Sequence, residues 1–503
     1  PWVDAGDGAQ VRIAMTVGSG IDGAGRLLQV REENSSDQDQ DEIEVNLQEQ
    51  QGRLFADLKT GADVASSQRL NANAGISNRG VCLFGSGFIV SQDEANALGL
   101  GKIHGLEKHI RHYRNGKDLT QTSRNAMVID LFGLTADATR QSFPEVYQWV
   151  LEKVKPERDQ NKRDSRRINW WLFGETNPKI RHQLAGLPRY IATVETTKHR
   201  VFQFLDAEIL PDNMLVNIAC DDAAYLGVVS SRPHSAWALA AGGRLGVGND
   251  PRYNKTRCFE TFPFPDATPE QQAQIRDLAE RLDAHRKRQQ AQHPELTLTG
   301  MYNVLEKLRA GEPLTAKDKT IHEQGLVSVL RELHDELDRA VFAAYGWDDL
   351  AEQLVGKPGA TTPLPDKSEA QAEAEEELLR RLVALNAERA AEEARGLVRW
   401  LRPEYQNPSA AVAPEQREAE LDDTTDFESA PAAAAATGKL TWPKQMREQV
   451  AAVRHALSQS PLPADALAAQ FKRSPKVAVQ AVLDALEELG MVQQADNSYR
   501  LAS

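Results

Sequence analysis

Two clusters of cationic side chains in the middle of the chain have the residue types that bind a polyanion. The first lies within residues 153–200, which contain twelve lysines and arginines interrupted by Trp170 and Trp171. The second runs from Arg244 to Arg257 and mixes arginine, asparagine and lysine donors with glycines. Cations bind phosphates, whereas forked donors and flat rings bind bases. Both clusters therefore favour nucleic-acid binding, although composition alone leaves a solvated protein surface as the alternative for each.

A glycine-rich motif follows the first predicted strand. Residues 18–23 read Gly-Ser-Gly-Ile-Asp-Gly and match the G-x-G-x-x-G pattern of dinucleotide-binding sites. Such a site needs a helix directly after the glycines, because its N-terminal amides hold the phosphate. Here residues 24–26 lead into another predicted strand, so we expect a hairpin loop. A nicotinamide- or flavin-dependent enzyme is the alternative, and a helix after Gly23 would support it.

The histidines and cysteines predict no metal site. His322 and His334 each lack the second histidine of an H-E-x-x-H motif, and we expect both on a solvated, salt-bridged helix. The three cysteines, Cys82, Cys220 and Cys258, are far apart and form no CxxC motif. This usage is typical of a reducing compartment.

Composition excludes several classes of protein. The 503 residues carry 59 Lys+Arg against 73 Asp+Glu, a formal net charge of −14, and the acidic excess lies mainly in residues 33–44 and 369–430. No apolar run of about 18 residues predicts a membrane span, and no signal peptide is predicted, so we expect a cytoplasmic protein. The chain starts at Pro1 rather than Met, from which we expect the C-terminal part of a longer protein.

The first half of the chain predicts mainly strands. Residues 11–17, 27–30 and 42–47 have the apolar content and alternation of half-buried strands. Between residues 52 and 265, short apolar runs alternate with helical pieces such as 144–155. The runs cover residues 81–84, 87–90, 127–131 and 190–194. This alternation favours an α+β domain with a mixed sheet.

Helices are predicted after Pro265. Thr268 to Gln271 form a capping box, a second helix covers 301–309 and stops at Gly311, and a third opens at Thr315. The buried side of the third is expected to hold Val329, Leu330, Leu333, Leu337 and Val341. Residues 356–368 predict a linker, 369–401 a charged helix solvated on most of its surface, and 406–438 a disordered segment.

The last segment predicts a winged helix. Helices at 443–458, 463–471 and 475–489 precede a hairpin at 491–501. The third helix starts with cations that could contact DNA, but its later turns carry carboxylates that would repel phosphate. Docking on another protein is therefore the favoured role, and DNA contact is the alternative.

Several strings resemble the late catalytic strands and target-recognition region of large class I S-adenosylmethionine-dependent DNA methyltransferases. These adenine-N6 enzymes occur in fused type II restriction–modification enzymes and in phage-defence systems. The resemblance covers roughly residues 1–350, and its most specific string is Arg252-Tyr253-Asn254-x-Thr256-x-Cys258-Phe259-x-x-Phe262-Pro263-Phe264-Pro265. The other matching strings are 1–4 with 7–15, 194–200 and 210–213.

The resemblance implies a multidomain chain of α/β and α+β class. Residues 1–50 would end a methyltransferase catalytic domain, 51–265 would form a target-recognition domain, and 266–353 a helical region. Outside the resemblance, the sequence pattern predicts the linker, the charged helix and the disordered segment within residues 354–438 and the winged helix at 439–503.

The chain departs from this family at the catalytic motifs. The family's cofactor loop, F-x-G-x-G, and its catalytic Asn-Pro-Pro-aromatic motif are absent from the sequence, where Asn177-Pro178 and Asn407-Pro408 are followed by Lys and Ser. The motif matters because the adenine amino group needs acceptors for its hydrogens and an aromatic ring against the flipped base. We therefore assign no catalytic residue here and expect S-adenosylmethionine to bind a missing N-terminal part.

The resemblance implies that this chain selects the duplex DNA sequence to be methylated. Candidate DNA-binding residues are Lys198, His199, Arg200, Arg244, Asn249, Arg252, Tyr253, Asn254, Lys255 and Arg257. Arginine and asparagine suit bidentate contacts to guanine and adenine, and lysine suits phosphate. Turn formation is the alternative for Asn249, Asp250 and Asn254. The alternative function is a non-enzymatic specificity subunit that acts with a separate methyltransferase. Other restriction or defence proteins could bind the winged helix.

Overall fold

The computed structural model divides the chain into two compact units, Pro1–Pro414 and Glu415–Ser503. It describes most of the first unit and parts of the second. The described residues are 2–4, 10–12, 15–18, 25–35, 43–52, 54, 60–245, 250–364, 367–408, 442, 449, 452–453, 456–457, 462–472, 475–488, 492–495 and 498–501. No helix among these residues is long and apolar enough to cross a membrane.

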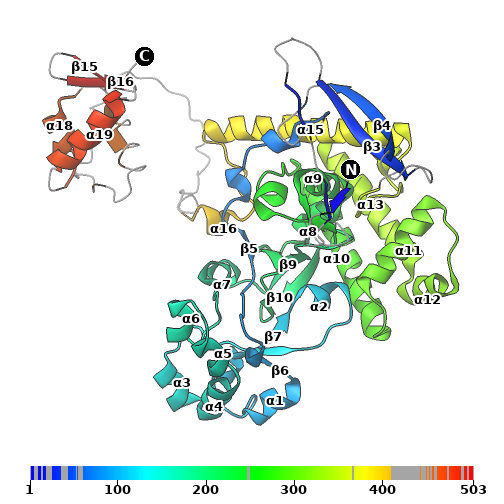
Figure 1. The fold of residues 1–503 in the computed structure, drawn as a ribbon, viewed down its shortest axis with the longest axis horizontal. Coiled ribbons are helices and arrows are strands. Elements are labelled where there is room, and N and C mark those ends of the chain that lie inside the picture. Colours follow the sequence, from blue (N-terminus) through cyan, green and yellow to red (C-terminus); the bar gives the residue numbers. More distant parts are fainter. Residues whose placement is uncertain are drawn as a thin grey trace, which may run out of the picture. The chain divides into compact units, whose positions relative to one another are not determined.

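The N-terminal strands pair two by two (Figure 1). Strand β1 (Trp2–Asp4) pairs antiparallel with β2 (Gln10–Arg12), and β3 (Gly25–Ser35) pairs antiparallel with β4 (Ile43–Gly52). The strands predicted at 27–30 and 42–47 are thus confirmed as parts of β3 and β4. The strand predicted at 11–17 is wrong at residues 15–17, which adopt no regular structure, and residues 13 and 14 lie outside the described residues. Residues 19–24, and with them most of the glycine-rich motif, lie outside the described residues.

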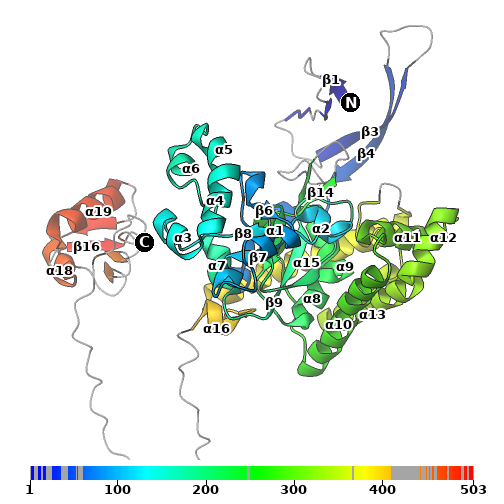
Figure 2. The ribbon, with the colours of Figure 1, turned by 90° about the horizontal axis from the view of Figure 1, so that it is seen from below.

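Two four-stranded sheets form the middle of the first unit. One is antiparallel, in the order β10-β9-β12-β5, and the other has the order β11-β7-β8-β6 with β11 parallel to β7. The first sheet contains β5 (Ser77–Arg79), β9 (Arg189–Val194), β10 (Gln203–Asp206) and β12 (Leu215–Ile218). The second contains β6 (Ile89–Val90), β7 (Ile110–Arg114), β8 (Met127–Ile129) and β11 (Leu210–Pro211). The predicted α+β organisation with a mixed sheet is confirmed, since Figure 2 shows helices interspersed with these strands.

Short helices pack around both sheets. They are α1 (Gln92–Ala97), α2 (Gly116–Thr120), α3 (Ala136–Ser142), α4 (Pro144–Lys153), α5 (Lys155–Asp159), α6 (Asp164–Ile168) and α7 (Pro178–Leu184). Val146 and Val150 of α4 are buried against Val128 and Ile129 of β8. Trp170 and Trp171 pack against the same core, edge to face with each other.

Helices α8 (Ala223–Ser230) and α9 (Arg232–Ala241) lead into a helical region. This region contains α10 (Pro269–Gln292), α11 (Leu298–Ala310), α12 (Ala316–Gly325), α13 (Val327–Tyr345) and α14 (Asp348–Leu354). The predicted capping box is confirmed, since Thr268 and Gln271 exchange side-chain and backbone hydrogen bonds at the start of α10. Gly311, with φ of 69°, ends α11 as predicted.

The single helix predicted from Thr315 is wrong in its length, because the helix is interrupted at Leu326. This residue has φ of 43° and separates α12 from α13. The buried stripe of α13 then runs through Val327, Leu330, Leu337 and Val341 with helical spacing. Val329 lies off this stripe and is 42% exposed, so its predicted burial is wrong.

The charged helix α15 (Glu369–Ala394) joins the core of the first unit. Ala374, Leu378 and Leu382 are buried in the same cluster as the apolar faces of α10, α11 and α13. The helix is therefore part of the first unit, along with α16 (Pro403–Gln406).

The described part of the second unit has the elements α18 (Ala464–Ala469), α19 (Lys476–Glu488), β15 (Val492–Ala495) and β16 (Ser498–Leu501). The two strands pair antiparallel, and Leu462 bridges to Tyr499 beside them. Leu467, Phe471, Val482 and Leu486 belong to its apolar core. Most of the helix predicted at 443–458 and of the segment 406–438 lies outside the described residues. The winged helix stays a prediction.

Candidate nucleic-acid interface

The second cationic cluster contains a β-hairpin that forms a small sheet of its own. Strand β13 (Gly243–Leu245) pairs antiparallel with β14 (Asp250–Arg252), so Arg244 lies opposite Pro251. Arg244 is exposed. Gly242 precedes the hairpin, where an added Cβ would lie 2.5 Å from the carbonyl oxygen of Arg252, so only glycine fits this close approach. Asn249 lies outside the described residues.

Strand β14 is attached to the residues that follow β9. Thr196 and Arg252 form an antiparallel bridge. The amide of Tyr253 donates to the carbonyl of Glu195 at 2.6 Å, and the amide of Thr197 donates to Pro251 at 3.3 Å. These bonds fix the hairpin on the sheet.

The buried side chain of Arg200 hydrogen-bonds both β14 and the residues that follow β9. Its guanidinium donates to the carbonyls of Val194, Glu195 and Pro251, the last at 3.1 Å, and lies 5.0 Å from the ring of Tyr253. Burial lowers the pKa of Arg200 to about 10, so the side chain remains cationic at neutral pH. Because its donors point at backbone carbonyls, Arg200 positions the hairpin.

Tyr253 lies inside the fold, where its hydroxyl is 2.9 Å from Nε2 of His234. Burial raises the pKa of Tyr253 well above its ordinary value and lowers that of His234 to about 3. Its ring is only 1% exposed and packs against Phe202. It therefore anchors the strand end and offers no flat face to solvent.

Lys198 and His199 connect this site to the helical region. The exposed ammonium of Lys198 donates to Oδ1 of Asn303 on α11 at 2.7 Å. His199 is buried, with Nε2 2.9 Å from the same oxygen and Nδ1 3.1 Å from Oγ1 of Thr361. Burial lowers the pKa of His199 to about 4, so the ring is neutral at pH 7.

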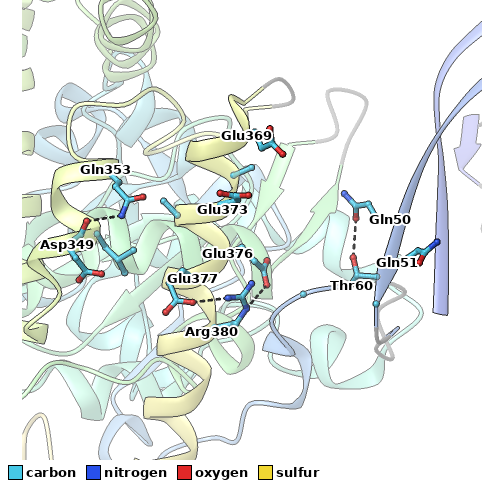
Figure 3. A pocket seen from close by; sticks show the side chains of 15 residues that line it. Gln50, Gln51, Thr60, Asp349, Gln353, Glu369, Glu373, Glu376, Glu377 and Arg380 are labelled. Atoms are coloured by element: carbon cyan, nitrogen blue, oxygen red, sulfur yellow. Dashed lines mark hydrogen bonds and ion pairs between the residues drawn. The ribbon is translucent and has the colours of Figure 1, made fainter. Parts of the chain in front are cut away.

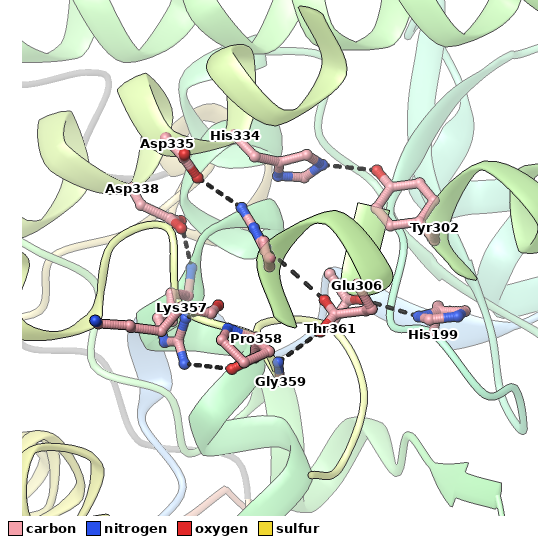
Figure 4. Close-up of polar contacts among 12 residues, drawn as sticks. His199, Tyr302, Glu306, His334, Asp335, Asp338, Lys357, Pro358, Gly359 and Thr361 are labelled. Atoms are coloured by element: carbon pink, nitrogen blue, oxygen red, sulfur yellow. Dashed lines mark hydrogen bonds and ion pairs between the residues drawn. The ribbon is translucent and has the colours of Figure 1, made fainter. Parts of the chain in front are cut away.

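Figure 4 shows the polar contacts around Thr361 and α11. Glu306 accepts a bond of 2.6 Å from the amide of Gly359, and Tyr302 bonds His334 at 2.7 Å. The expectation that His334 lies on a solvated helix face is wrong, because the ring is 4% exposed and belongs to this network. The residues after α14 are therefore hydrogen-bonded to the helical region. Through Thr361 they also contact His199, which lies beside the hairpin junction.

The string that follows the hairpin, from Asn254 onward, forms a turn and an anchor. Asn254 caps a π-helix at Lys255–Phe259, with its Oδ1 accepting from the amide and hydroxyl of Thr256 at 3.0 and 2.6 Å. Asn254 thus forms a turn, which was the alternative to a DNA contact for this residue. Lys255 pairs with Glu260 at 2.7 Å, and Arg257 is exposed.

Sequence reasoning missed an ion cluster at the same place. The Glu195 carboxylate contacts the guanidinium groups of Arg79, on β5, and Arg252, on β14. The carboxylate side chain is 6% exposed, and the two arginines are 44% and 40% exposed. Arg79 lies 116 residues from Glu195, so no local pattern could pair them.

Much of the first cationic cluster is engaged within the fold. The buried Arg158 donates to two backbone carbonyls, and Arg166 lies 3.5 Å above the ring of Phe84. Arg181 forms a two-point pair with Asp130, at 2.5 and 3.0 Å. These three side chains therefore serve contacts within the protein, and their geometry does not favour a DNA contact.

The first Asn-Pro pair and a pocket lined by carboxylates lie elsewhere in the described residues. Asn177, in the first Asn-Pro pair, has φ of 42°, caps α7 and donates to the carbonyl of Arg79 at 2.7 Å, so its amide serves the fold. A pocket of about 1230 Å³ lies between the end of β4 and helices α14 and α15, and carboxylates dominate its lining. Figure 3 shows Glu369, Glu373, Glu376 and Glu377 on one side of it. This charge disfavours a phosphate-bearing ligand.

The comparisons with known proteins concern the same region. Residues 68–266 match a family model described as the target recognition domain of MmeI. A comparison with curated proteins finds no match. A solved structure of the type IIL restriction–modification enzyme MmeI in complex with DNA matches with 18% identity and a TM-score of 0.49, over 69% of this chain and 40% of that chain. The present chain thus spans about two fifths of that chain's length. Residues 68–266, which include both sheets and the hairpin, are similar to the target recognition domain of MmeI.

Proposed function

We propose that this chain recognises a specific sequence in duplex DNA as the target-recognition part of a type II restriction–modification enzyme. The observation that carries the proposal is the match of residues 68–266 to a target recognition domain. The surface chemistry supports it, since Arg79, Arg244 and Arg252 place guanidinium groups on an exposed hairpin and strand end. Forked donors on an exposed hairpin suit base edges in the major groove.

The candidate residues divide by burial into two roles. Lys198, Arg244, Arg252, Lys255 and Arg257 keep exposed or partly exposed cations and would contact DNA, together with Asn249. His199, Arg200 and Tyr253 are buried and would act by holding the hairpin in position. Asn254 would shape the turn that follows it.

The reaction of the larger enzyme would be methyl transfer from S-adenosylmethionine to adenine N6, as the family resemblance implies. The residues that bind the cofactor and the flipped adenine would then lie outside the present sequence. The protein would work in the cytoplasm, where host and phage DNA are found, and a winged helix in the second unit would dock other defence proteins.

A fluorescence-anisotropy titration with labelled duplex DNA tests the recognition role. Affinity should fall linearly with salt concentration on a double-logarithmic plot, with a slope set by the phosphates contacted. Arg244→Ala should weaken binding, whereas Arg281→Ala on α10, an exposed arginine paired with Asp277, serves as the control. Binding that is absent, or indifferent to salt, would contradict the proposal.

The second candidate function is a specificity subunit without catalytic activity. The native polypeptide, immunoprecipitated from its host, distinguishes the two functions. Methylation by a single polypeptide that contains this sequence supports the enzyme, and methylation that needs a separate chain supports the subunit.

A further inference from the structure

The Glu195 carboxylate lies between two arginines that come from distant strands. Arg252 contacts Oε1 of Glu195 through Nε and through Nη2, each at 2.8 Å. Arg79 contacts Oε2 through Nη2. Each carboxylate oxygen therefore holds one guanidinium, and the pair of arginines is linked through a single buried side chain.

The backbones that carry the two arginines are also fixed. The carbonyl of Arg79 accepts a bond of 2.7 Å from Asn177, and Gly80 next to it packs so closely that a Cβ would lie 2.0 Å from the carbonyl oxygen of Pro211. Arg252 is held by its bridge to Thr196. Both side chains thus start from rigid positions and end on the same carboxylate.

The contact with Glu195 selects which edge of Arg252 faces outward. Its Nε edge is occupied by the carboxylate, and in the part of the chain that the structure describes no acceptor contacts its Nη1 atom. The end of the fork, formed by Nη1 and Nη2, is the edge that can donate two parallel bonds to the O6 and N7 atoms of guanine.

A phosphate contact would not need this arrangement. Phosphate is bound well by a mobile cation, and a neighbouring carboxylate weakens that attraction. A guanine contact gains from it, because a guanidinium that is already oriented loses less conformational entropy when the two bonds form.

We propose that Arg79 and Arg252 each read a guanine of the target site, and that Glu195 is the positioning residue that orients both. The inference rests on the proposed function and adds Arg79 as a second specificity-determining residue. The recognised duplex then contains two guanines whose contacts depend on one shared carboxylate.

The test is selection of bound sequences from a random duplex library, carried out with the complete chain and with variants. Arg79→Lys keeps the charge and removes the fork, so it should relax the preference for one guanine by about 5- to 150-fold. Glu195→Gln should relax the preference at two positions, one of which is the position lost in Arg79→Lys. The salt dependence of binding should change little in Arg79→Lys. Arg281→Lys should return the motif of the parent chain.

Melting temperatures are measured for each variant, so that misfolding is recognised. If Glu195→Gln fails to fold, Arg79→Lys decides: loss of one guanine preference supports the inference, and an unchanged motif overturns it. A folded Glu195→Gln variant that selects the same motif also overturns it. If the parent chain selects no sequence at all, the proposed function fails and this inference falls with it. If the parent chain selects a motif, and both Arg79→Lys and Glu195→Gln still select that motif, then this inference is wrong while the proposed function stands.

Discussion

At the scale of single residues, burial decides which members of the second cationic cluster can contact a ligand. Arg200, His199 and Tyr253 have side chains that serve the junction between β9, β14 and the segment around Thr361. The sequence predicted the cluster but not this division, because the acceptors of Arg200 include the carbonyl of Pro251, which is 51 residues away in the sequence. Glu195 carries no local signal of its own, and Arg79 is paired with it solely by the tertiary fold.

Replacing Arg200 tests its positioning role. Arg200→Ala removes a buried donor and leaves several carbonyls without it, so unfolding free energy should fall by about 3 kcal/mol. Arg257→Ala, at an exposed position five residues after the end of β14, should change stability by less than about 0.5 kcal/mol. Urea denaturation measures both. Equal stability of Arg200→Ala and the parent chain would contradict the role.

Because two buried histidines are neutral in the folded protein, we expect the folded state to lose stability in mild acid. Burial lowers the pKa of His199 to about 4 and that of His234 to about 3, below the ordinary value of 6.5. Between pH 6.5 and the folded pKa the unfolded chain binds more protons, so stability falls as pH falls. At pH 5 each such histidine should cost about 2 kcal/mol. Asp338, whose pKa is raised to about 6, opposes this effect between pH 6 and 4.

The measurement is the melting temperature at pH 7 and pH 5. It should be clearly lower at pH 5, and His199→Gln should reduce the difference, since glutamine does not titrate. A melting temperature that rises on acidification would show that these rings are protonated in the folded protein.

At the scale of elements, local signals predicted the helix ends that they encode. The capping box at Thr268 and the terminal Gly311 were read correctly because each is set by neighbouring residues. The break at Leu326 was missed, since leucine at φ of 43° carries no glycine or proline signal. The burial of one face of α15 was also missed, because its charged sequence hides three spaced apolar residues.

A glycine at the break should stabilise the helical region. Leu326 is 48% exposed, so Leu326→Gly loses little apolar burial and relieves the left-handed backbone, with a gain of about 0.5–1 kcal/mol. Val329→Gly is the matched control, since this equally exposed residue lies inside α13 and its replacement should cost up to about 1 kcal/mol. Thermal melting distinguishes them, and destabilisation by Leu326→Gly would show that its side chain matters more than its backbone.

At the scale of the whole molecule, the target-recognition region and the helical region form one folded unit. Trp237 of α9 and Phe262 share a core with α10, α11 and α13, and Arg200 donates its amide to Thr361. The predicted domain boundary at residue 265 therefore marks the place where strands give way to helices within one compact unit. Composition revealed the change from strands to helices but could not reveal the shared core.

Truncation tests which unit binds DNA. A chain that ends at Pro414 keeps the complete first unit and should bind the same duplex with an affinity within about threefold of the full chain. A chain that ends at Pro265 lacks the helices that complete the core and should not fold cooperatively. Anisotropy and circular dichroism give the two results. A large loss of affinity in the longer truncation would assign DNA contacts to the second unit.

Sequence selection by the first unit is what the proposed function requires above all. Selection from a random duplex library with the purified chain, followed by sequencing of the bound fraction, measures it most directly. We expect enrichment of a single motif, with competitor duplexes that lack the motif bound at least tenfold more weakly. Recovery of unenriched DNA under conditions where the chain is folded and binds duplex would contradict it.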